Sequence, residues 1–118
     1  MTDGESRMWH VTVTVAGDAH DPSEVRSGLE RLVEERPFLL TVRYREDRAE
    51  VRYWEQAEEI LDAASLALRL WNEHRGSAGL PRWEVIGLEV LDRDTFYMRV
   101  DEGTAPRPIA DAGAVRPY

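Results

Sequence analysis

The sequence predicts a single α+β domain in which four strands and two helices follow one another in the order β-α-β-β-α-β. Two observations lead to this prediction. Apolar residues alternate with polar ones in four segments, and they recur at helical spacing in two others. A chain of 118 residues is long enough for one domain with its own core, and it is short for two domains of typical size.

The first two elements have the clearest signals. Three valines that alternate with polar residues predict a strand over 9–15. A helix is expected over 22–35, with Asp21 as its N-cap and Pro22 at its first position. Its apolar residues share one side of the helix, so this side should pack against the sheet.

A β-hairpin is expected next. Residues 38–45 and 49–54 both alternate between apolar and polar or charged side chains, and a short charged turn joins them. The alternation assigns these residues of the first hairpin strand to the core: Phe38, Leu40, Val42 and Tyr44.

The second half of the domain holds the longest helix and the last strand. The helix is expected over 55–75, with Gly76 as its left-handed C-cap. A strand with two fairly apolar faces is expected over 83–91, followed by one helical turn at 95–99.

This order of elements predicts a ferredoxin-like domain over residues 9–100. In that arrangement the four-stranded antiparallel sheet has the strand order 4-1-3-2, and both helices cover one face. Residues 1–8 are polar and are expected to be a disordered N-terminus. Half of residues 101–118 are Pro, Gly or Ala, so this segment is expected to be a flexible tail.

The uncovered face of the sheet is the candidate for an interface or a ligand site. Two tryptophans and a valine there would be an unusually apolar patch for a monomer. A second copy packed on this face would bury them, and Trp and Arg are frequent interface anchors. The alternation places these candidate residues on it: His10, Thr12, Arg43, Glu50, Arg52, Trp54, Trp83, Val85 and Glu89.

His10 is the most reactive side chain predicted on this face. It would lie near Glu50 or Arg52 and near Glu89, and a histidine beside a carboxylate can act as a general base near neutral pH. A half-exposed strand histidine with one hydrogen bond is the simpler interpretation. The three histidines have no metal-ligand spacing, and no catalytic motif is present, so no catalytic residue, metal or cofactor is expected.

Composition limits the classes of partner. The chain has 15 basic residues, all of them Arg, and 23 acidic residues, and its net charge of −8 disfavours nucleic acid. It has no cysteine, which excludes disulfides and thiolate chemistry. No apolar run is long enough to span a bilayer, and a cytoplasmic location is expected.

Families that share this order of elements can be tested by their motifs. An RNA-recognition motif needs several outward aromatic residues over 48–54, where only Trp54 qualifies. An acylphosphatase needs a Gly-rich, Arg-bearing anion loop after the first strand, but the segment 16–21 is acidic. Small dimeric α+β-barrel monooxygenases and ACT-like regulatory domains share the layout and offer no strict motif.

The sequence therefore predicts a small protein-interaction or regulatory module that forms a homodimer through its open sheet face. The alternative is a small-molecule-binding domain or a cofactor-independent enzyme of the dimeric α+β-barrel type. A protein or small-molecule partner remains open in both cases, and so does the question of whether the protein is an enzyme.

Overall fold

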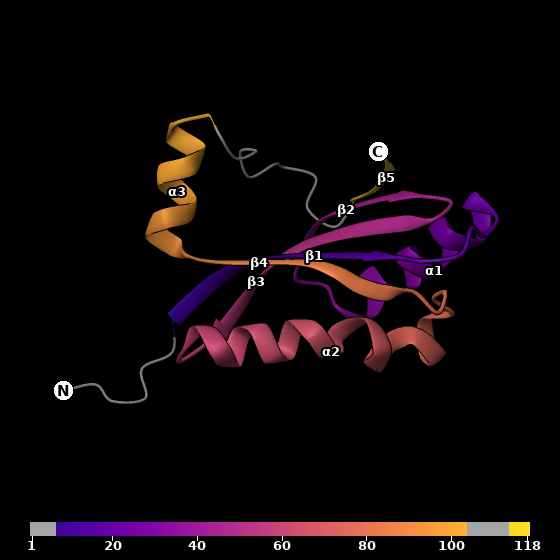
Figure 1. The fold of residues 1–118 in the computed structure, drawn as a ribbon, viewed down its shortest axis with the longest axis horizontal. Coiled ribbons are helices and arrows are strands. Elements are labelled where there is room, and N and C mark those ends of the chain that lie inside the picture. Colours follow the sequence, from indigo (N-terminus) through magenta and orange to yellow (C-terminus); the bar gives the residue numbers. More distant parts are fainter. Residues whose placement is uncertain (1–6, 104–113) are drawn as a thin grey trace.

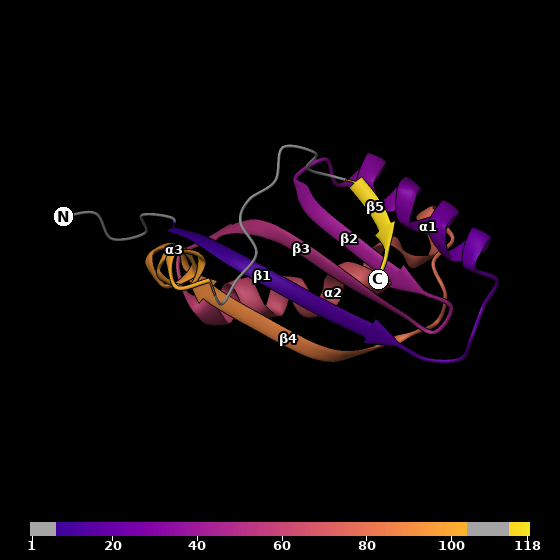
Figure 2. The same cartoon turned by 90° about the horizontal axis from the view of Figure 1, so that it is seen from above.

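The computed structural model describes residues 7–103 and 114–118, which form one sheet with helices on both of its faces (Figure 1). The strands lie in the order β4-β1-β3-β2-β5 (Figure 2). The mixed α+β class and the order 4-1-3-2 of the first four strands are confirmed. The elements within the described ranges are β1 (Arg7–Ala16), α1 (Pro22–Glu35), β2 (Leu39–Arg45), β3 (Arg48–Ala57), α2 (Ile60–Ala78), β4 (Glu84–Asp92), α3 (Arg93–Asp101) and β5 (Ala114–Pro117).

The expected number of strands was wrong, because the described residues contain five and not four. The fifth strand, β5, pairs in parallel with β2, and Val115 lies opposite Val42. It comes from the 101–118 segment, of which residues 104–113 lie outside the described residues. Four residues are too few for a visible alternation. Its pairing covers the edge of β2 that a four-stranded sheet would leave open.

The expected number of helices was also wrong, because α3 is a nine-residue helix and not a single turn. The side chain of Asp92 caps it by accepting a hydrogen bond of 2.8 Å from the backbone N–H of Thr95. This helix lies on the opposite face of the sheet from α2 (Figure 1). One end of the face expected to be open is therefore covered.

The core lies between the sheet and the helices α1 and α2. The predicted N-cap of α1 is confirmed, since the Asp21 side chain accepts a 2.8 Å hydrogen bond from the backbone N–H of Ser23. The largest side chains that are almost completely buried come from both layers: Trp71, Tyr53, Leu29, Leu32, Leu39, Val11, Val13, Val15, Val25, Val42 and Val51.

Helix α2 is displaced along the chain relative to the prediction. Strand β3 continues to Ala57, which pairs with Arg7 of β1, so the helix begins only at Ile60. Its left-handed C-cap is Gly79, with a φ of 72°, and not Gly76. A glycine followed by further helix-compatible residues is tolerated within a helix, so Gly76 did not mark the end.

Candidate functional site

The structure brings together most of the side chains predicted for the uncovered face. His10 pairs with Trp54 across β1 and β3, and it lies opposite Leu91 of β4. One row further along, Thr12 lies between Arg52 and Glu89. In the next row Glu50 of β3 lies opposite Arg43 of β2 in the strand register. All four of the strands β1 to β4 thus contribute to a continuous band of mostly polar side chains.

Trp83 and Val85 were wrongly assigned to this face. The register between β1 and β4 shifts between Thr14 and Val15, so that Val85 pairs with Val15. Such a bulge reverses which residues of the strand face the helices. Trp83 is only 4% exposed and stacks on Trp71 of α2, with ring centroids 5.9 Å apart.

His10 is buried beneath α3. Its imidazole ring stacks on Phe96 with a centroid distance of 4.0 Å, and it meets Trp54 edge-on at 5.2 Å. Burial, helped by the positive charge of Arg52, lowers the pKa of His10 from 6.5 to about 4, against the opposing effect of Glu89. The ring is therefore neutral at pH 7, and a base this weak, covered by aromatic rings, is poorly suited to proton abstraction.

The charged residues of the band are engaged with one another. Arg52 and Glu50 form an ion pair of 3.3 Å, and Glu89 pairs with Arg99 of α3 at 3.0 Å. The Oγ1 atom of Thr12 is buried without a hydrogen-bond partner among the described residues. The band consequently helps to hold α3 on the sheet.

An apolar pocket of about 480 Å³ lies at the same end of the sheet. Phe38 was assigned to the core, but it is 75% exposed at the pocket. The register between β2 and β3 shifts between Leu39 and Thr41, so that Leu39 enters the core in place of its neighbours. The pocket is lined by Met8, Pro37, Phe38, Leu39, Leu40, Trp54, Glu55 and Gln56.

Of the pocket residues, sequence reasoning identified only Trp54 as a candidate. Pro37 could have indicated that Phe38 lies outside the regular alternation of the strand, because the backbone next to a proline often leaves regular structure. Trp54 also stacks on Tyr97 of α3 at 6.1 Å, so the pocket and the helix share this side chain.

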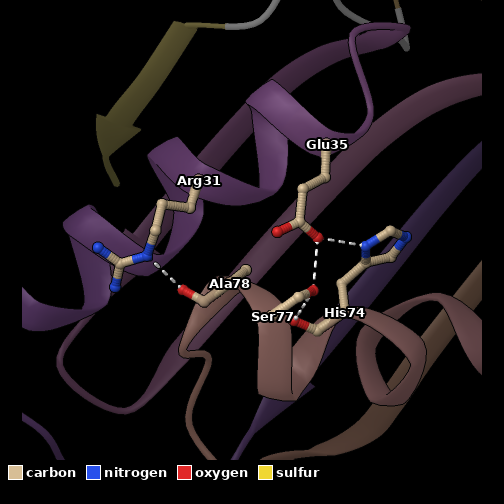
Figure 3. A network of polar contacts seen from close by, with 5 residues as sticks. All are labelled: Arg31, Glu35, His74, Ser77 and Ala78. Carbon is tan, nitrogen blue, oxygen red and sulfur yellow. Dashed lines mark hydrogen bonds and ion pairs between the residues drawn. The ribbon is translucent and has the colours of Figure 1, made fainter.

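A serine, a histidine and a glutamate meet between α1 and α2 (Figure 3). The hydroxyl of Ser77 donates to Oε1 of Glu35 at 2.7 Å, and Nδ1 of His74 contacts the same oxygen at 2.6 Å. These bonds hold the pKa of Glu35 below its usual value. Since the hydroxyl is bonded to the carboxylate and not to the imidazole, the set lacks the geometry of a nucleophile and its base. Next to it, Arg31 donates to the carbonyl of Ala78, so the cluster joins the two helices.

Other site types are limited in the described part of the chain. Its His and acidic residues form no group of three or more that could hold a metal ion. None of the helices in these ranges combines the length and apolarity that crossing a bilayer requires.

The fold and the site define a small α+β domain with an aromatic cluster and an apolar pocket at one end of its sheet. The family model that matches residues 8–107 is described as a domain of unknown function, DUF8830, and the chain belongs to this family. No curated protein matches the sequence. Among solved structures, an acylphosphatase from Coxiella burnetii is 16% identical over the whole of both chains, with a TM-score of 0.39.

Proposed function

We propose that this protein is an interaction module without a catalytic role, and that it forms a homodimer through the end of the sheet marked by Phe38. The observation that carries the proposal is an aromatic side chain, 75% exposed, at the rim of an apolar pocket of about 480 Å³. Exposed apolar surface of this kind is typical of interaction sites.

A two-fold symmetry axis close to Phe38 would bury the Phe38 side chains of both copies in one interface. In such an interface the same patch is used twice, so each Phe38 can enter the pocket of the other copy. Burial of one phenylalanine side chain stabilises a complex by about 2 kcal/mol, and the symmetry provides two such burials. Met8, Tyr97 and Met98 are also exposed, by 38%, 45% and 54%, and can extend the contact.

The charge of the pocket favours a second copy as the occupant. Two chains that each carry a net charge of −8 repel one another, so they must meet where the surface is neutral. All but one of the pocket residues are uncharged. The exception, Glu55, lies 3.9 Å from the guanidinium of Arg36, which offsets its charge.

A small-molecule-binding domain is the second candidate, because about 480 Å³ lies within the usual range of ligand pockets. The enzymatic form of this candidate gains no support from His10. Its ring is only 4% exposed, and its weak basicity at neutral pH follows from that burial.

Native mass spectrometry and light scattering over a range of concentrations test the proposal. The unmodified protein should be a dimer of unchanged subunit mass, and Phe38→Glu should be a monomer with an unchanged circular dichroism spectrum. Ile86→Glu is the matched control, because Ile86 is 57% exposed and lies at the other end of the sheet, where β4 meets the end of β1. A monomer at every concentration, or equal effects of the two variants, would refute the dimer. A retained small molecule lost in Phe38→Glu would favour the second candidate.

A further inference from the structure

A second cavity, of about 360 Å³, lies between the C-terminal half of α2 and the start of β4. The start of β4 pairs with Ala16 at the end of β1. The Phe38 pocket includes Met8 and Gln56, which pair with each other at the beginning of β1. The two cavities are thus at opposite ends of the sheet. This one is lined by Leu68, Trp71, Asn72, Arg75, Arg82, Trp83, Glu84 and Val85.

Two arginines at this cavity have no side-chain partner among the residues that the structure describes. The side chains of Arg75 and Arg82 form no ion pair or hydrogen bond with any residue in 7–103 or 114–118. Glu84 is the one acidic residue of the lining, so the cavity carries a net positive charge of one.

The apolar part of the cavity is held rigidly. Trp71 and Trp83 are stacked with only 10° between their ring planes. Each indole N–H already donates to a backbone carbonyl, of Pro81 at 2.9 Å and of Asp18 at 2.8 Å respectively. The indoles therefore have no free donor to offer and can contribute only apolar surface. Leu68 and Val85 complete this surface, and Leu68 is still 48% exposed.

We propose that this cavity binds a small monocarboxylate that carries an aryl or branched aliphatic group. A guanidinium binds a carboxylate with two parallel hydrogen bonds, and two of them face the cavity. A single negative charge on the ligand balances the lining, whereas a dianionic phosphate would exceed it. The apolar group would lie against Leu68 and Val85, beside the edges of the stacked indoles. This site is independent of the dimer, because none of its residues lines the Phe38 pocket.

The probe for this proposal is 3-phenylpropionate, with 3-phenylpropanamide as its neutral analogue and phenyl phosphate as the dianion. The readout is a titration of the indole N–H resonances of Trp71 and Trp83 by two-dimensional NMR. The acid should give a saturable shift of these resonances, the amide should not, and phenyl phosphate should bind more weakly than the acid. Because a hydrogen bond to a charged group contributes about 1.5 kcal/mol or more, Arg82→Gln or Arg75→Gln should weaken binding about tenfold.

Arg69→Gln is the matched control for charge. Arg69 lies on the same helix, it is paired with Glu73, and it does not line the cavity, so this variant should bind the acid as the unmodified protein does. The proposal is overturned if the acid causes no saturable shift at either indole, or if amide and acid bind equally. Tighter binding of phenyl phosphate would contradict the monocarboxylate class, and an equal loss in Arg69→Gln would reduce the effect to overall charge.

Discussion

Acidification should destabilise this protein through one buried side chain, His10. The ring lies between Phe96 and Trp54 and is 4% exposed. A positive charge there would be desolvated, and the nearby guanidinium of Arg52 would repel it. Glu89 would attract the charge, but its carboxylate is already bonded to Arg99 of α3. Protonation of His10 should therefore loosen the contact between α3 and the sheet.

The size of the effect follows from the two pKa values of this histidine. Its pKa is about 4 in the folded protein and 6.5 without the surrounding structure. A folded-state pKa below the unfolded one means that the unfolded chain binds the proton more tightly, so stability falls as the pH falls through this window. Linkage gives a loss of about 2 kcal/mol between pH 7 and pH 5, which approaches about 3 kcal/mol at pH 4.

The assay is urea unfolding at pH 7 and pH 5 of the unmodified protein and of His10→Phe. The variant keeps an aromatic ring between Phe96 and Trp54 but cannot be protonated. His20 and His74 are present in both proteins, so any contribution that they make cancels in the comparison. The free energy of unfolding of the unmodified protein should fall by about 2 kcal/mol more than that of the variant. Parallel losses in the two proteins would show that His10 is not buried as described.

Three further substitutions test the stability of the fold. Glu35→Gln should lower the urea midpoint at pH 7, because it removes the carboxylate shared by Ser77 and His74. Since these bonds lower the pKa of Glu35 from 4.5, the advantage of the unmodified protein should disappear as the pH falls below that value; a difference that persists in acid would contradict this. Gly17→Ala should cost about 1–3 kcal/mol, because its Cβ would lie 2.5 Å from Cδ1 of Trp83. Gly76→Ala should raise the stability by about 0.5–1 kcal/mol, because Gly76 lies within α2 with open space around it. Equal shifts in the melting temperatures of Gly17→Ala and Gly76→Ala would refute the close contact between Gly17 and Trp83.

Local signals made much of the fold predictable from the sequence. The cap formed by Asp21 and the proline after it begin α1 where they were expected to. The three valines of β1 alternate without interruption, and all are buried between the sheet and the helices. The start of α2 was misplaced because Glu58 and Glu59 resemble the acidic first turn of a helix, whereas strand pairing with β1 keeps the chain extended as far as Ala57.

The aromatic cluster was not predictable, because it depends on a contact between elements that no periodicity links. Helix α3 has no apolar stripe of the usual kind, and Phe96 and Val100 are its buried residues. Its position is instead determined by the end of β4. Asp92 is the last residue of this strand, where it pairs with Trp9, and its side chain also caps α3. The sequence indicated that His10 is an unusual residue of the sheet. Phe96, which stacks on its ring, comes from a segment that was expected to form a single helical turn.

Both candidate cavities arise where the strand register shifts by one residue. Leu40 and Ile86 are the residues that find no partner at these shifts, and both are common strand residues with nothing that marks a bulge. The shift at Leu40 moves Phe38 out of the core to the rim of one pocket. The shift at Ile86 moves Trp83 under α2, where it lines the other. The alternation alone gave the opposite orientation for both aromatic residues, so the surfaces most suited to binding are the ones that the sequence pattern could not locate.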